Sequence, residues 1–316
     1  MYFSIRHMTE FNYSAPITES VMEIRMQPRT EDMQRCLSFR LEITPRTTAT
    51  TYRDYLGNHV HHFDIPERHK RLLLIAESLV EIRPPLPVPD SLSPSAWDEL
   101  DILLESADVW ESLTPSHFAR PTALLYQLAQ DLNITRRDDP LSLMREINSA
   151  IYDTFTYKPN STQVDSPIDD ALSDRQGVCQ DYAHIMIALA RELRIPCRYV
   201  SGYLFHREDD RARTANDASH AWVEALLPGL GWVGFDPTNN VLAQDRHIRV
   251  AVGRDYMDVP PTRGVYKGKA DTELKVSVRV YPTEKLPPPE ELTLIDEEPA
   301  IMSPTDSELQ QIQQQQ

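Results

Sequence analysis

Three side chains in the second half of the chain could together attack an amide bond: Cys179, His220 and Asp236. A cysteine attacks as its thiolate, and both a helix N-terminus and a nearby imidazolium stabilise that form. Cys179 follows Gly177 and Val178, and helical spacing begins directly after it. We therefore expect Cys179 to lie at the start of a helix, with its sulfur facing the helix amides.

The segment "ASHAWVEALLPGLGWVGFDPTNN", residues 218–240, predicts a β-hairpin, because two apolar runs flank a Pro-Gly-Leu-Gly turn. Folding it about the turn places His220 opposite position 239, and a shift of three residues would place it opposite Asp236. We expect the two to be cross-strand neighbours. An imidazole beside a carboxylate can take the proton of a thiol and return it to a leaving group. Each residue alone is more often structural, and the combination favours a site.

The other two cysteines, Cys36 and Cys197, each begin a strand-like run, so we expect them to be packing residues. Three cysteines without a CxxC pair predict neither a disulfide framework nor a zinc knuckle.

An acyl-transfer site also needs donors for a developing oxyanion. The backbone amide of Cys179 is one candidate donor, and the side chains of Gln176 and Tyr157 are candidates for a second. Trp222 lies at an even step from His220, so it could cover the imidazole as a wall of the site. It could equally be a core aromatic residue.

A metal site is the alternative suggested by "NHVHHF", residues 58–63, because His59 and His61 share one strand face. No third ligand has suitable spacing, and exposed strand histidines explain the pattern as well. We expect no metal and no cofactor.

The elements that must position these residues fall into two parts. Short runs with alternating apolar residues before residue 83, such as "CLSFRLEITP", predict an antiparallel sheet. After a proline-rich stretch, "PTALLYQLAQDLN" and "PLSLMREINSAIYDTF" have helical spacing, and strand-like runs follow them. The predicted organisation is an N-terminal β-domain (1–83), a linker with a first helix (84–104), an α+β catalytic core (105–260), a C-terminal strand (261–283) and a disordered acidic, glutamine-rich tail (284–316).

The chain has 316 residues and a net charge of −16, which argues against nucleic-acid binding. The last 31 residues contribute −7 of this charge. No apolar run reaches the roughly 20 residues that span a bilayer, and the N-terminus lacks the pattern of a secretory signal. These features predict a cytoplasmic protein that does not bind membranes. They leave its oligomeric state open.

Three segments, "GVCQDYAHIMIALARELRIPCRYVSGYL", "SHAWVEA" and "GWVGFDPT", resemble the core of the transglutaminase-like superfamily. "IRHMTEFNYSAPITESVMEIRMQPR" and "DYLGNHVHHFDI" resemble the N-terminal β-domain of its bacterial members, so the resemblance spans residues 1–282. It implies a papain-like fold in which a helix bearing the cysteine packs on an antiparallel sheet. It also implies Cys179 as nucleophile, His220 as base and Asp236 as the orienting acid.

The leading hypothesis is an enzyme that cleaves a peptide-like amide through a thioester. With water as acceptor it is a protease or amidase, and with an amine as acceptor it is a protein-glutamine acyltransferase. The partner is then a peptide or protein substrate. The alternative is a binding or assembly module that keeps the fold without turnover.

Overall fold

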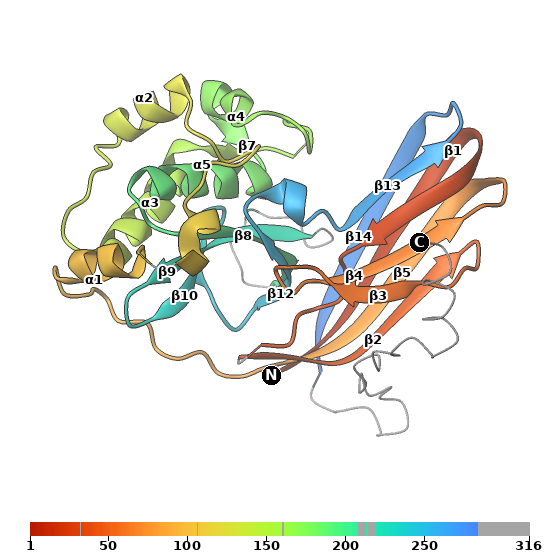
Figure 1. Ribbon diagram of the computed structural model, residues 1–316, viewed down its shortest axis with the longest axis horizontal. Helices are drawn as coiled ribbons and strands as arrows, with labels where there is room; N and C mark the ends of the chain where they lie inside the picture. Colours follow the sequence, from red (N-terminus) through yellow and green to blue (C-terminus); the bar gives the residue numbers. More distant parts are fainter. Residues whose placement is uncertain (32, 106, 160, 208–212, 214–218, 284–316) are drawn as a thin grey trace, which may run out of the picture.

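The structure is a computed structural model that describes residues 1–283 except 32, 106, 160, 208–212 and 214–218. The tail predicted to be disordered lies outside the described residues. Figure 1 shows helices gathered over one sheet on the left and a second, long-stranded sheet on the right. The two sheets meet where the N-terminus lies.

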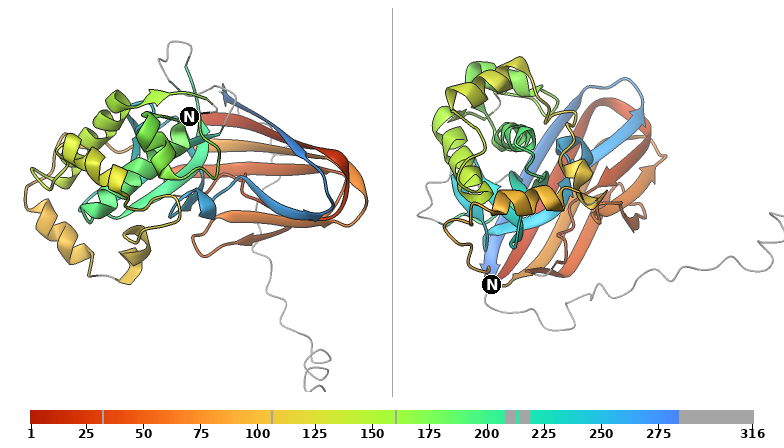
Figure 2. Two further views of the ribbon diagram at one scale, coloured as in Figure 1. Left: turned by 90° about the horizontal axis from the view of Figure 1, so that it is seen from above. Right: turned by 60° about the vertical axis from the view of Figure 1, so that its left-hand side comes forward.

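The right-hand sheet has seven strands: β1 (Tyr2–Ile24), β2 (Gln34–Thr44), β3 (Thr50–Arg53), β4 (His59–Ile65), β5 (His69–Ile82), β13 (Thr262–Lys267) and β14 (Thr272–Thr283). β1 lies at its centre, with its first half between β5 and β14 and its second half between β4 and β13. All of these pairs are antiparallel. Figure 2 shows the long strands curving together around this domain.

Two features of this sheet differ from the sequence interpretation. β1 continues through Pro16 as one strand. Its pairing with β5 shifts register across Pro16, its pairing with β13 shifts between Thr18 and Val21, and Glu19 has a left-handed backbone. A bulge of this kind lets a strand bend while its two halves pair with different neighbours. The segment 261–283 holds two strands, and both join the N-terminal sheet by pairing with β1.

The helical part comprises α1 (Ala96–Leu103), the 3-10 helix η1 (Ala107–Ser112), α2 (Ala123–Asp131), α3 (Pro140–Thr154), α4 (Ile168–Asp174) and α5 (Cys179–Glu192). Side-chain caps begin two of them: Thr122 accepts the Leu125 amide, and Asp139 accepts the first amides of α3. None of the described helices is long and apolar enough to cross a membrane.

The second sheet has five antiparallel strands in the order β11 (Val241–Ala243), β10 (Gly231–Asp236), β9 (His220–Leu227), β8 (Cys197–Leu204) and β12 (His247–Gly253). A short parallel pair, β6 (Thr156–Tyr157) and β7 (Gln176–Gly177), and the 3-10 helix η2 (Tyr256–Asp258) complete the elements. α5 packs between this sheet and α2, α3 and α4.

The apolar spacing of α5 explains its central place. Tyr182, Met186 and Leu189 are buried on it, and its residues from Gln180 to Arg191 are all buried. A fully buried side chain of this size contributes about 1.5 to 3 kcal/mol to stability, so α5 is held firmly. The fold is α+β, with an antiparallel β-domain followed by a helix that packs on an antiparallel sheet, as predicted.

Candidate active site

Cys179 is the first residue of α5, and it is half-buried. The carboxylate of Asp181 accepts the Val178 amide at 2.8 Å and the Thr162 hydroxyl at 2.6 Å, which fixes the turn into the helix. Gly177 is required there, because a Cβ would stand 2.9 Å from two atoms of the Asp181 side chain. The short Gly-Val-Cys stretch therefore holds the sulfur at the positive end of a helix dipole.

The other two cysteines lie in different surroundings. Cys36 and Cys197 are buried, and burial raises the pKa of each thiol to about 12. Both are therefore protonated near neutral pH and unsuited to nucleophilic attack.

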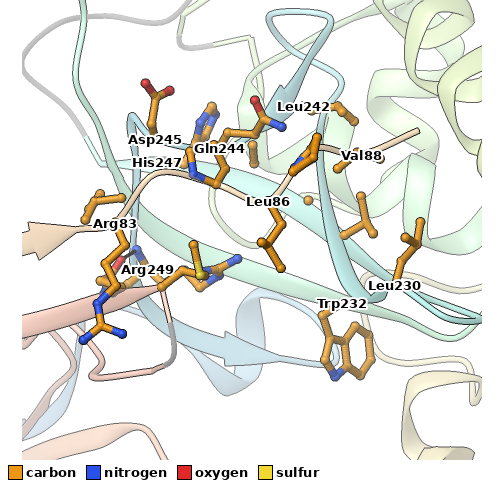
Figure 3. Close-up of a pocket in the computed structure, with 18 of the residues that line it drawn as sticks. Arg83, Leu86, Val88, Leu230, Trp232, Leu242, Gln244, Asp245, His247 and Arg249 are labelled. Atoms are coloured by element: carbon orange, nitrogen blue, oxygen red, sulfur yellow. Dashed lines mark hydrogen bonds between the residues drawn. The ribbon is translucent and has the colours of Figure 1, made fainter. Parts of the chain in front are cut away.

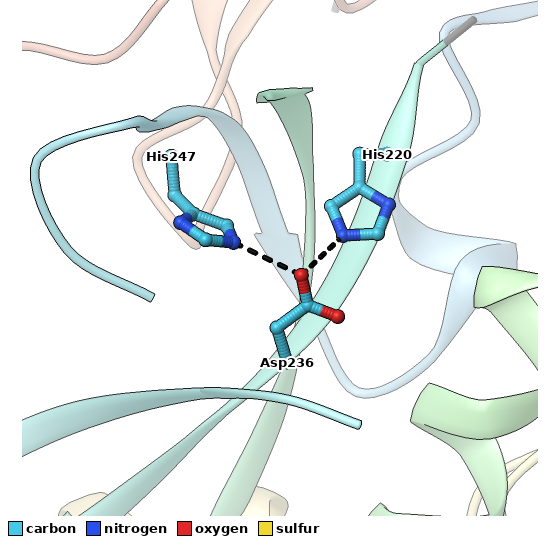
Figure 4. Close-up of side chains that lie close together, drawn as sticks. All are labelled: His220, Asp236 and His247. Atoms are coloured by element: carbon cyan, nitrogen blue, oxygen red, sulfur yellow. Dashed lines mark hydrogen bonds and ion pairs between the residues drawn. The ribbon is translucent and has the colours of Figure 1, made fainter. Parts of the chain in front are cut away.

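His220 begins the first strand of the predicted hairpin and Asp236 ends the second. Both therefore lie at its open end, where they meet. His220 Nε2 is 2.7 Å from Asp236 Oδ2, and both residues are buried. Figure 4 shows this contact. Phe235 pairs with Val223, and continuing this register places Asp236 opposite Trp222. The contact is therefore diagonal across the strands, and the three-residue shift considered from the sequence does not occur. Diagonal neighbours can still form this contact, because the side chains of His220 and Asp236 lie on the same face of the sheet.

Asp236 accepts hydrogen bonds from five donors. Its Oδ1 takes the backbone amides of Thr238 at 3.0 Å and Asn239 at 3.2 Å. Its Oδ2 takes the Asn239 side-chain amide at 2.8 Å and lies within reach of His220 and His247. Burial alone would raise the pKa of Asp236, but the charge of His220 and the hydrogen bonds of both histidines hold it far below its usual range. Asp236 is therefore an ionised, tightly held carboxylate.

Burial alone would lower the pKa of His220, but the charge and hydrogen bond of Asp236 outweigh it. Interaction with Cys179 also raises the pKa of His220, and the result is about 10. Nε2 is taken by Asp236, which leaves Nδ1 as the ring nitrogen available to Cys179; among the described residues Nδ1 has no hydrogen-bond partner. At neutral pH His220 is thus a buried imidazolium between a sulfur and a carboxylate.

Gln176 and Tyr157 lie next to the nucleophile. Tyr157 pairs with Gly177 across β6 and β7, and burial together with the charge of Cys179 raises the pKa of Tyr157 well above its usual range. Gln176 is half-buried three residues before Cys179. Within the described part of the chain, neither side chain makes a hydrogen bond to protein, so both remain candidates for the second oxyanion donor.

Trp222 combines the two roles considered for it. It is fully buried between Val200 and Val252, so it is a core residue. Its ring centroid also lies 6.0 Å from that of His220, so it forms part of the wall that shields the imidazole from water.

His247 is the site residue that the sequence did not indicate. It begins β12, is buried, and places Nε2 3.1 Å from Asp236 Oδ2, beside His220. No local motif marks it, because its contact depends on β12 pairing with β8 rather than with its neighbours in sequence. Among the described residues, these three side chains are the one group of three or more that resembles a metal site.

Hydrogen bonding explains this trio better than a metal does. In a tetrahedral zinc site with bonds of 2.0–2.1 Å, ligand atoms lie about 3.3 Å apart. The separations of 2.7 and 3.1 Å from Asp236 Oδ2 are shorter and match N–H···O bonds. His59 and His61 belong to no such group within the described residues, and burial lowers the pKa of each to about 4.

Residues 3–81 match the bacterial transglutaminase-like N-terminal region, and residues 127–237 match the transglutaminase-like superfamily. An uncharacterised protein of Mycobacterium leprae is 34% identical over 279 residues, which cover 87% of this chain and 96% of that protein. A protein-glutamine gamma-glutamyltransferase of Pseudomonas aeruginosa is 33% identical over 176 residues, which are 50% of this chain and 22% of that enzyme.

Among solved structures, a "putative cysteine protease" from Cytophaga hutchinsonii has the same fold, with a TM-score of 0.69 at 22% identity. The alignment covers 91% of this chain and 93% of that one. Both matched regions coincide with the two parts of the fold, and the second contains Cys179, His220 and Asp236. The chain therefore belongs to the transglutaminase-like superfamily, with the N-terminal region of its bacterial members.

Proposed function

We propose that the protein cleaves peptide-like amide bonds through a thioester on Cys179, with His220 as acid and base and Asp236 as its orienting partner. The observation that carries this proposal is the Asp236–His220 contact of 2.7 Å, on a strand against which α5 packs with Cys179 as its first residue. A helix start stabilises a thiolate, and the imidazolium beside it does the same.

In the first half-reaction, the Cys179 thiolate forms a bond to the carbonyl carbon, and the carbonyl π electrons move to oxygen. The backbone amide of Cys179, with Gln176 or Tyr157, would donate to that oxyanion. As the oxyanion collapses, the C–N bond breaks and the His220 imidazolium protonates the departing nitrogen. The products are a thioester and an amine or ammonia.

In the second half-reaction, neutral His220 removes a proton from water, which attacks the thioester. The acid leaves, and the thiolate and imidazolium form again. An amine in place of water gives transfer, and the partial likeness to the Pseudomonas aeruginosa gamma-glutamyltransferase supports this as the second candidate. The substrate class in both cases is a peptide or protein carboxamide.

A glutamine-containing peptide and a labelled primary amine separate these reactions in one incubation. We expect ammonia or peptide fragments from the wild-type protein and none from Cys179→Ala. The matched control is Cys36→Ala, which removes a buried thiol in the other domain and should retain activity. Label incorporation would identify transfer, and its absence alongside product would identify hydrolysis.

Thiol reactivity tests the site without a known substrate. Iodoacetamide near pH 7 should modify Cys179 well before Cys36 and Cys197 in the folded protein, because burial keeps the latter two protonated. Equal rates at the three cysteines would reject an activated nucleophile and favour a binding module that keeps the fold without turnover.

A further inference from the structure

A second histidine, His247, contacts the carboxylate of Asp236. Figure 4 shows His220 and His247 converging on the same oxygen, Asp236 Oδ2, from two different strands. His247 has no direct contact with the sulfur that would give it a role in attack. Its hydrogen bond to the proposed triad is the one to Asp236, and this bond is the basis of the role proposed below.

The protonation state of His247 follows from its partner. An ionised carboxylate only accepts hydrogen bonds, so Nε2 of His247 must carry the proton. Burial is the largest influence on His247 and lowers its pKa, opposed by Asp236 and reinforced by the charges of His220 and Arg246. His247 is therefore a neutral donor, whereas His220 on the same oxygen is a cation.

We propose that His247 is a positioning residue of the triad: it holds Asp236 Oδ2 and takes up part of its charge, which sets how readily His220 releases its proton to the leaving group. This inference rests on the proposed function. Thr238 and Asn239 hold the carboxylate independently. Removing His247 therefore leaves Asp236 in place with more of its charge directed at His220. The imidazolium is then too stable to be a good acid.

The N-terminal domain holds the strand that carries His247. Gln34 accepts the backbone amide of Arg249 at 2.8 Å and donates to its carbonyl at 2.8 Å. Asn58 accepts the amide of Val252 at 2.8 Å and donates to its carbonyl at 2.8 Å. These two side chains act on the free edge of β12 as a neighbouring strand would. The imidazole therefore stands on a rigid support.

A cavity of about 290 Å³ lies behind His247, between the proline-rich linker and β10–β12. Figure 3 shows His247 on its wall with Leu86, Trp232 and Gln244. Truncating His247 would join the space of the lost ring to this cavity, and engineered cavities of this kind bind small ring molecules. Free imidazole should therefore reach Asp236 in a His247→Ala protein.

The test compares wild type, His247→Ala, His247→Gln and the control His184→Ala, which removes another buried imidazole of the same core. Two rates are measured at pH 7: amide turnover, and alkylation of Cys179 by iodoacetamide. Turnover needs the proton of His220, whereas alkylation needs only the thiolate. We expect turnover of His247→Ala to fall about 10-fold to 100-fold, as for other partners of a ligating or catalytic group.

Alkylation of Cys179 should stay within about 3-fold in the same protein. His247→Gln keeps an N–H donor at a similar reach, so it should recover most of the turnover. Added imidazole should raise turnover of His247→Ala and not that of His184→Ala.

Turnover of His247→Ala within about 3-fold of wild type would overturn the inference. So would a parallel loss of turnover and alkylation in both His247 variants, since that indicates a purely structural role. Failure of the proposed function looks different, because the wild-type protein itself would then show no turnover that depends on Cys179.

Discussion

Replacing Asp236 with asparagine tests the reasoning about the site most directly. The amide has one acceptor oxygen and one NH₂ group where the carboxylate has two acceptors. If the amide oxygen takes the position of Oδ1, it still accepts the hydrogen bonds from the backbone amides of Thr238 and Asn239. The NH₂ group then faces His220, His247 and the side-chain amide of Asn239. The opposite orientation would set the NH₂ group against two backbone donors, so the first is favoured.

Two consequences follow from that orientation. His220 must accept a hydrogen bond at Nε2, which moves its proton to Nδ1, where it can no longer take a proton from Cys179. Burial is then no longer opposed by the charge of a carboxylate, so the pKa of His220 falls from about 10. A wrong tautomer of this kind reduces turnover by about 10⁴-fold in comparable triads.

The stability cost is smaller than the loss of turnover. Once both histidines change tautomer, the NH₂ group of the new amide can donate one hydrogen bond to His220 and one to His247. Only the side-chain amide of Asn239 then loses its acceptor. One unsatisfied buried donor costs roughly 1 to 3 kcal/mol. Asp236→Asn should therefore fold, with a modestly lower midpoint in urea.

The assay is turnover and Cys179 alkylation at pH 7, with circular dichroism as the check on folding. Asn239→Ala is the matched control, because it removes one donor from Asp236 without changing the His220 tautomer; its turnover should fall less than about 10-fold. If Asp236→Asn keeps its turnover within about 10-fold of wild type while folded, the tautomer argument is wrong.

Gly177→Ala should lower the free energy of unfolding by about 1 to 3 kcal/mol in urea titrations, because the new methyl group displaces the capping carboxylate of Asp181. Gly202→Ala should cost more than about 4 kcal/mol or abolish folding, since its Cβ would overlap a backbone oxygen of β12 and stand 2.5 Å from the Trp222 ring; a normal melting temperature would contradict this. The raised pKa of His220 contributes stability that is complete below its unfolded value of 6.5 and is lost as pH rises through about 10. Stability measured from pH 6 to 10 should therefore fall less steeply for His220→Ala than for wild type.

Local patterns in the sequence predicted the parts of the site that are themselves local. Helical spacing after Cys179 predicted α5, and the turn from Pro228 to Gly231 predicted the hairpin that carries His220 and Asp236. The exact register escaped prediction, because a turn length can be accommodated in more than one way. The two residues still met, since a diagonal neighbour is within reach of an imidazole.

The parts that escaped prediction depend on pairings between distant segments. His247 reaches Asp236 because β12 crosses to the far edge of its sheet and pairs with β8. β13 and β14 return to the N-terminal sheet and pair with β1, whose partner residues lie 238 to 281 positions earlier. Periodicity indicates which face of a strand is buried, but it does not indicate which strand lies beside it.

These distant pairings make the N-terminal domain part of the catalytic geometry. β12 is an edge strand, and an edge leaves backbone amides and carbonyls that need partners. Gln34 and Asn58 supply those partners from the β-domain, and Tyr203 of β8 donates to the Met26 carbonyl at 3.2 Å. The edge that carries His247 is thereby fixed by a domain that contributes no group to the reaction. The β-domain and the core consequently act as one support, in which the position of the Asp236 carboxylate depends on contacts made by both.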